Sequence, residues 1–225
     1  MYAINFGSLA PYTDLLAAGL VQTAEVSAAT LAIAVPVGLG GALLRTSQHP
    51  VPRSIAAGYV QIIRNVPLLV ILFIVYFELP ELGIKLDPFT AGVTGLSLNT
   101  IAYVIEIFRG GLAGIPPGQY EAANSLGLRP HQVFLYVVFP QLIRISFPAL
   151  GNQVVGTTLA SSQCYFIGVS ELTSVANQVG STTFRYFEVF VVIAVLYFVV
   201  AQTINRGWVL LGRRLLTDQP RRVSG

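Results

Sequence analysis

The feature that most constrains this chain is a series of long apolar stretches that carry almost no charge. Residues 27–44 are uncharged, end at Arg45 and have the length of a membrane helix, which we expect to begin further back, near Gly19. The chain has 225 residues, of which 54% are hydrophobic and only 10% are charged. Soluble globular proteins are about one quarter charged. The sequence therefore predicts an integral membrane protein with a single domain over residues 1–225.

Four further segments are long and apolar enough to cross a bilayer. They are residues 55–78, 88–108, 143–168 and 187–210. With the first segment they predict an all-α membrane protein with five transmembrane helices. The second segment contains Arg64, whose charge must reach the membrane surface or find a partner.

The basic residues predict how these helices are oriented. Five spans place the termini on opposite sides, and Lys and Arg concentrate in cytoplasmic segments. One side holds 11 of the 13 basic residues: Arg45, Arg53, Arg64, Arg109, Arg129, Arg144, Arg206, Arg213, Arg214, Arg221 and Arg222. The other side holds Lys85 and Arg185 together with Asp14, Glu78, Glu81, Asp87, Glu171 and Glu188. We expect the N-terminus outside, without a signal peptide, and the C-terminus in the cytoplasm.

A polar segment, "QYEAANSLGLRPHQVFLYVVFP" at residues 119–140, interrupts the pattern between the third and fourth spans. Residues 119–126 are good helix formers, and Gly127 favours a left-handed stop. Pro130 suits the first turn of a second short helix that Pro140 ends. The segment therefore predicts a compact cytoplasmic helix–turn–helix. Its residues leave two uses open, packing on the protein's own helices or docking on another protein.

Polar residues inside the third span suggest a charge network and a cavity wall. Glu106 and Arg109 are three residues apart on one helix, so they can pair, and Arg64 is a candidate to share the pair. Such a network is either structural or part of gating and solute contact. Asn99 and Tyr103 are four residues apart and face one direction, which suits a cavity wall or a hydrogen bond between helices.

The fourth span is uncharged but too polar to face lipid. It contains Asn152, Gln153, Thr157, Thr158, Ser161, Ser162 and Gln163. Such residues either allow helices to pack closely, as Gly151 and Gly156 do, or line a polar path. The candidate translocation path comprises Asn99, Tyr103, Asn152, Thr157, Ser161, Ser162 and Gln163.

Several motifs resemble those of one transporter family. "EAANSLG" followed by "VFLYVVFPQLIRISFP" resembles the EAA loop of ABC import permeases. "YVQIIRNVPLLVILFIVYFELP" and "LSLNTIAYVIEIFRGGLAGIPPGQYEAA" are similar to the second and third spans of the polar amino acid uptake family. "IGVSELT" is similar to that family's outer segment after span four. The resemblance covers roughly residues 55–190.

The resemblance implies a function for the cytoplasmic segment. It makes residues 113–142 a coupling loop in which Glu121, Ala122, Ala123 and Gly127 contact a separate ATP-hydrolysing subunit. The implied partners are two such subunits, a second permease that is homologous or identical, a periplasmic solute-binding protein, membrane lipid and a polar amino acid. The implied location is the bacterial inner membrane. The chain has no G-x-x-x-x-G-K-[ST] motif, so we expect no cofactor of its own, with ATP bound by the partner, and no enzymatic activity.

One departure from the family leaves the solute open. Leu159 and Ala160 stand where the family usually has Lys-Asp, ahead of Ser161, Ser162 and Gln163. A secondary transporter and an ion channel with span four as its selectivity path are the alternatives. A secondary transporter normally has paired, interrupted helices in corresponding halves, and a channel has no need of a docking helix. One cysteine and two histidines make metal and redox chemistry unexpected. No nucleophile–base pair can be assembled either, so we expect no catalytic residues, and we expect no nucleic-acid partner.

The topology can be tested by labelling cysteines introduced at Asp14 and Asp218. The distribution of basic residues predicts that a cysteine at position 14 reacts with a membrane-impermeant reagent from the periplasm and that one at position 218 does not. Labelling of both positions from the same side would contradict the predicted orientation.

Overall fold

The computed structural model describes residues 4–216, and the secondary structure in this range is helical. The α-helices are α1 (Thr13–Arg45), α2 (Pro50–Asn65), α3 (Leu68–Phe73), α4 (Pro88–Ala113), α5 (Pro117–Ser125), α6 (Pro130–Gln132), α7 (Phe139–Ala160), α8 (Leu172–Thr183) and α9 (Tyr186–Leu216). Three 3-10 segments, Phe6–Tyr12, Leu79–Leu82 and Ser161–Ile167, and two π-helical segments, Ile74–Glu78 and Val133–Val138, extend them. Asp218, one of the two labelling positions, lies outside the described residues.

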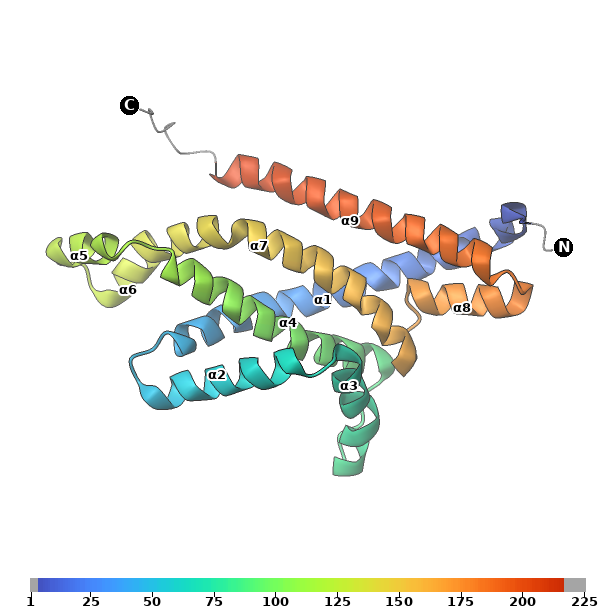
Figure 1. The fold of residues 1–225 in the computed structure, drawn as a ribbon, viewed down its shortest axis with the longest axis horizontal. Coiled ribbons are helices and arrows are strands. Elements are labelled where there is room, and N and C mark those ends of the chain that lie inside the picture. The colour runs from blue at the N-terminus through green and yellow to red at the C-terminus, as the bar shows by residue number, and fades with distance from the viewer. Residues whose placement is uncertain (1–3, 217–225) are drawn as a thin grey trace.

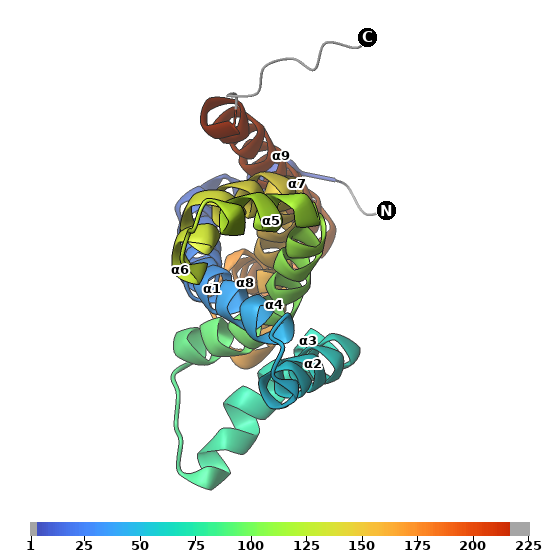
Figure 2. The same cartoon turned by 90° about the vertical axis from the view of Figure 1, so that its left-hand side faces the viewer.

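Three helices, α1, α4 and α7, run side by side along the molecule, with α9 beside them on one side and α2 on the other (Figure 1). The contact between α1 and α4 is the most extensive, followed by that between α4 and α7. The short helices α5 and α6 lie together at one end, as the end-on view shows, and α8 lies at the opposite end (Figure 2). The described chain begins and ends at opposite ends of the molecule (Figure 1).

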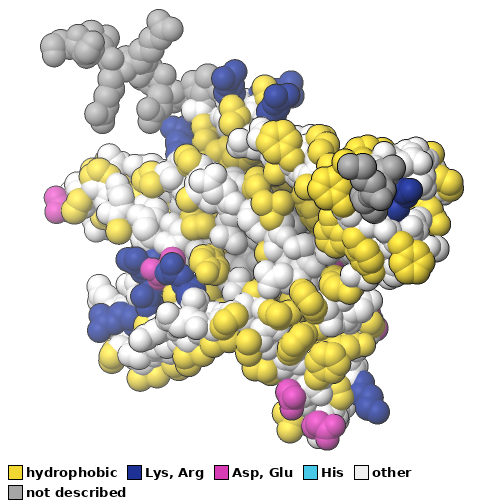
Figure 3. Space-filling view, turned by 45° about the vertical axis from the view of Figure 1, so that its right-hand side comes forward, with side chains coloured by type: hydrophobic (Ala, Val, Ile, Leu, Met, Phe, Trp, Pro, Cys, Tyr) yellow, Lys and Arg dark blue, Asp and Glu magenta, His cyan; other side chains and the backbone are white. Residues whose placement is uncertain are grey.

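Four helical stretches are long and apolar enough to cross a membrane. They are Phe6–Arg45, Pro88–Ala113, Pro130–Ile167 and Tyr186–Leu216, and the pair Pro50–Asn65 and Leu68–Leu82 makes a fifth if its two bent halves count as one span. On the face seen in Figure 3, charged side chains lie toward the margins and the middle is hydrophobic or uncharged. The expectation of an all-α membrane protein is confirmed.

The second span is not the single helix expected over residues 55–78. The axes of its two halves differ by 104°. Pro67 explains the break, because a proline disfavours helical geometry in the residue before it and has no N–H to donate. Val66 is accordingly extended, with φ −102° and ψ 130°, and α3 begins only after Pro67. α2 begins earlier than expected, at Pro50, and packs against α1 and α4.

Pro140 does not end a short second helix, so that expectation is wrong. The helix that begins at Pro130 continues through Pro140 to Ile167. The turn ahead of it, Val133–Val138, is π-helical. A π turn shifts the hydrogen-bond pattern by one residue. Pro140 then lies in the first turn of α7, where the missing N–H of a proline is tolerated.

A helix of 12 residues, α8, lies between spans four and five, where the sequence predicted no helix. The side chain of Glu171 caps it, accepting hydrogen bonds from the backbone N–H groups of Thr173 at 2.8 Å and Ser174 at 2.9 Å. The hydroxyl of Tyr197 on α9 also donates to this carboxylate, at 2.8 Å. Glu171 is fully buried, and this acidic residue of the expected outer segment anchors α8 to α9.

Glycines allow α1 and α4 to approach closely. A Cβ atom built on Gly38 would overlap the side chain of Val104, whereas a Cβ on Gly40, two residues further along α1, meets no atom within 4 Å. Small residues at such contacts are typical of helices that pack within membranes.

We therefore expect Gly38→Leu to weaken the α1–α4 contact by about 1–3 kcal/mol, because the added side chain has no room. The purified protein in detergent should unfold at a temperature several degrees lower than the parent. Gly40→Leu is the matched control and should leave the unfolding temperature nearly unchanged. Equal effects of the two substitutions would contradict the close contact at Gly38.

Candidate functional site

A cavity of about 540 Å³, here called the polar cavity, lies between the α2–α3 break, α4 and the end of α7. Pro67 is one of its lining residues, so the bend in the second span shapes one of its walls. Its lining consists of Arg64, Asn65, Val66, Pro67, Leu68, Leu96, Asn99, Thr100, Tyr103, Gln153, Gly156, Thr157, Ala160 and Gln163. Amides, hydroxyls and one guanidinium thus meet in a bundle that is otherwise apolar.

Hydrogen bonds join two of its walls. The hydroxyls of Thr100 on α4 and Thr157 on α7 lie 3.3 Å apart, and Gln153 Nε2 donates to Thr157 Oγ1 at 3.2 Å. Both threonines are buried. These hydrogen bonds satisfy hydroxyl groups that would be costly to bury unpaired in an apolar environment. Packing and cavity lining, which the sequence left as alternatives, therefore involve the same residues here.

The structure brings together four of the seven residues expected on the path: Asn99, Tyr103, Thr157 and Gln163. It does not bring Asn152, Ser161 or Ser162 to the polar cavity. Asn152 is exposed on another side of α7. The hydroxyls of Ser161 and Ser162 donate to the carbonyls of Thr158 and Leu159, each at 2.7 Å.

Gln153 and Ala160 also line the polar cavity, although they were not among the residues expected on the path, and their spacing could have identified them. Residues 153, 156, 157, 160 and 163 all line the polar cavity and recur every three or four positions, which is one face of a helix. Gln153 was named among the polar residues of this span but not placed on the path, whereas Asn152 and Ser162, which do not line the cavity, were placed on it.

Arg64 lies at the junction of the polar cavity and a second one. The second cavity, here called the arginine cavity, has a volume of about 480 Å³ and is lined by Arg45, Ala57, Val60, Gln61, Arg64, Asn65, Tyr103 and Glu106. The guanidinium carbon of Arg64 lies 5.1 Å from the centre of the Tyr103 ring, within the range of a cation–π contact. The two cavities share Arg64, Asn65 and Tyr103.

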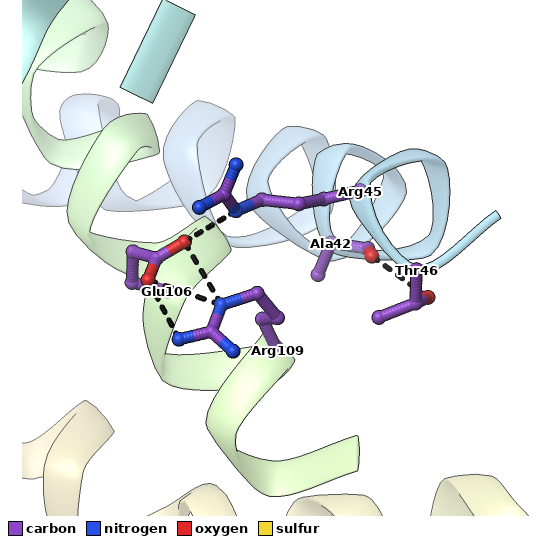
Figure 4. A network of polar contacts seen from close by, with 5 residues as sticks. All are labelled: Ala42, Arg45, Thr46, Glu106 and Arg109. Carbon is purple, nitrogen blue, oxygen red and sulfur yellow. Dashed lines mark hydrogen bonds and ion pairs between the residues drawn. The ribbon is translucent and has the colours of Figure 1, made fainter. Parts of the chain in front are cut away.

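A network of three charges adjoins the arginine cavity, which two of its members, Arg45 and Glu106, line (Figure 4). Glu106 pairs with Arg109, as the sequence predicted, with Oε2 at 2.9 Å from Nη2. Its other oxygen, Oε1, lies 2.7 Å from Nε of Arg45. The expected third member, Arg64, is not a salt-bridge partner of Glu106. Arg45 takes that position because α1 ends beside the face of α4 that carries Glu106.

The expected coupling segment folds as a capped helix at one end of the molecule. α5 ends in a Schellman motif in which the N–H of Gly127 donates to the carbonyl of Asn124 at 2.9 Å and that of Leu128 donates to the carbonyl of Ala123 at 3.3 Å. Gly127 has φ +72°, the left-handed conformation that its sequence context predicted.

Only part of this segment is available to another protein. Ala123 is buried, and it packs in a cluster with Val133 and Phe108. Glu121, Ala122 and Gly127 are exposed. The segment therefore packs on the protein's own helices through one face and leaves the other face uncovered.

Comparison with known proteins identifies the family. Residues 34–216 match the family described as "Binding-protein-dependent transport system inner membrane component". The chain is 34% identical over 213 residues to the probable glutamine ABC transporter permease protein GlnM of Bacillus subtilis, which covers 95% of this chain and 97% of the relative. It is 31% identical to the glutamine transport system permease protein GlnP of Escherichia coli K12, over 89% of this chain and 93% of the relative.

A solved structure agrees with these sequence matches. A crystal structure of an amino acid ABC transporter with histidines contains a chain that is 38% identical, with a TM-score of 0.88, over 95% of this chain and 100% of that chain. The family match includes all residues of the two cavities, the charge network and α5. The chain therefore belongs to the binding-protein-dependent transport system inner membrane components, the membrane-spanning permease subunits of ABC importers.

Proposed function

We propose that this permease carries a polar amino acid or a close derivative across the bacterial inner membrane. The observation that carries this proposal is the polar cavity, where the side chains of Asn99, Tyr103, Gln153 and Gln163 converge between α4 and α7. An amino acid presents an ammonium and a carboxylate, which need such donors and acceptors once water is removed. Relatives that are named as glutamine permeases and a neighbour described with histidines support this solute class.

In the proposed mechanism, α5 receives motion from a separate subunit that binds and hydrolyses ATP. α5 follows α4 after only three residues, 114–116, and its buried Ala123 packs against the start of the helix that becomes α7. α4 and α7 also form two walls of the polar cavity. A displacement of α5 would therefore act on the helices that shape the cavity.

The complete importer would contain further subunits. The proposal requires two ATP-binding subunits, a second permease that is identical or homologous, and a solute-binding protein in the periplasm. The exposed face of α5, with Glu121, Ala122 and Gly127, is the surface proposed to meet an ATP-binding subunit.

The function is tested by purifying the permease with the subunits encoded beside it and reconstituting the complex in liposomes. A panel of amino acids is supplied with the binding protein, and both ATP hydrolysis and uptake are measured. We expect at least one amino acid to stimulate both. Uptake that proceeds without ATP would instead favour the secondary transporter or the ion channel.

We expect Gln163→Leu to reduce uptake or change its selectivity by about tenfold, because the substitution removes a polar group from the cavity wall. Ser162→Leu is the matched control. Its hydroxyl bonds only to the carbonyl of Leu159 in this structure, so uptake should remain within about twofold of the parent. Unchanged transport in both variants would favour a purely structural role for the polar residues of α7 and of the 3-10 segment that follows it.

Gly127→Val should uncouple ATP hydrolysis from uptake. A β-branched residue at φ +72° costs about 1–3 kcal/mol, which is enough to reshape the end of α5 but not to unfold the bundle. We expect the variant to reach the membrane but to retain the ATP-binding subunit poorly or to hydrolyse ATP without uptake. Gly207→Val, at an exposed α9 glycine with open space around it, is the control. Normal subunit retention with normal uptake in Gly127→Val would contradict the coupling role.

A further inference from the structure

The charges along the two connected cavities indicate which solutes the permease accepts. We propose that it selects solutes with a net negative charge, such as amino acids with an additional carboxylate, and discriminates against cationic amino acids. This inference rests on the proposed function and refines it.

The first observation is the charge balance of the walls. Arg64 is the one charged side chain among the residues that line the polar cavity, and no Asp or Glu of the described chain lines it. The arginine cavity adds Arg45 and Glu106, so the lining of the two cavities together carries two guanidinium groups and one carboxylate. The net charge along this route is positive.

The second observation is that the only carboxylate on this route is already engaged. Glu106 binds Arg45 through Oε1 at 2.7 Å and Arg109 through Oε2 at 2.9 Å. Two cations thus bind this one anion, so Glu106 offers little attraction to a passing cation. The ammonium or guanidinium side chain of a basic amino acid would be desolvated here without a partner.

The third observation concerns Arg64 itself. Its guanidinium lies above the Tyr103 ring at the junction of the two cavities, and within the described residues it forms no salt bridge. Stacking on an aromatic ring occupies the face of a guanidinium and leaves its N–H edge available for a carboxylate. Asn99, Gln153 and Gln163 supply neutral groups around it, which suits the remaining polar atoms of an amino acid.

The position of Ala160 allows a direct test. Ala160 lines the polar cavity from α7, whereas Arg64 lines it from α2, and the small side chain of Ala160 contributes no charge. Ala160→Asp introduces a carboxylate into this cavity, whereas Ala160→Asn introduces a side chain of the same size without charge. The pair therefore separates the effect of charge from that of volume.

The experiment measures binding of radiolabelled L-glutamate, L-glutamine and L-arginine to the purified complex, and uptake of each by liposomes that contain it. We expect glutamate to bind more tightly than glutamine, and arginine to bind about tenfold or more weakly than glutamate. Ala160→Asp should reverse the order of glutamate and arginine, and Ala160→Asn should retain it. Arg64→Gln should abolish the preference for glutamate, while Arg53→Gln, on the same helix but outside both cavities, should not.

Two results would overturn the inference in distinguishable ways. If amino acids are taken up but arginine binds as well as glutamate, the charge selection is refuted and the proposed function stands. The same follows if Ala160→Asp leaves the order of preference unchanged. Failure of every amino acid to bind or to be transported would refute the proposed function and this inference with it.

Discussion

The packing of α4 among its neighbours is the interaction on which the rest of this structure depends. α4 contacts α1, α2, α3 and α7. In its most apolar stretch 61% of the residues are buried, a larger share than in the other three candidate spans that are single helices. Small residues make this possible, since a Cβ on Gly95 would meet Leu72 of α3 at 2.8 Å and one on Gly111 would overlap Ser146 of α7. Association within a membrane depends on such close contacts because lipid offers no hydrophobic driving force between helices.

The same helix supplies one wall of the candidate site. Asn99 and Tyr103 line the polar cavity, and Glu106 lies about one turn further along α4. Because α4 is held on several sides, these side chains are fixed relative to Gln153 and Thr157 on α7. A polar cavity can persist inside an apolar bundle only when its groups are bonded or open to water, and the contact between Thr100 and Thr157 meets this requirement.

Local chemistry predicted much of this molecule from the sequence. The apolar stretches located the spans, the spacing of Glu106 and Arg109 predicted their ion pair, and the context of Gly127 predicted its positive φ. In each case the controlling interaction lies within one segment of the chain. A pattern of this kind can be read without knowing how helices are arranged.

The features that the sequence did not reveal depend on contacts between distant segments. Arg45 and Glu106 are 61 residues apart and meet only because α1 ends beside α4. Glu171 was assigned to an outer segment, yet its carboxylate is buried and accepts a hydrogen bond from the hydroxyl of Tyr197, 26 residues later in the chain. The bend at Pro67 could have been anticipated from proline chemistry, but the cavity beside it requires α4 and α7 to close the other walls.

The connection between α5 and the cavity follows from how the link between α4 and α5 is built. This link is not a flexible tether, because the N–H of Gly114 donates to the carbonyl of Gly110 at 3.1 Å and that of Ile115 donates to the carbonyl of Leu112 at 3.2 Å. The side chain of Ile115 is buried in the same cluster as Ala123 and Val133. A packed cluster transmits displacement, since its side chains cannot move independently at the density of a protein interior. Any force applied to the exposed face of α5 must therefore move α4 and the start of the α7 helix together.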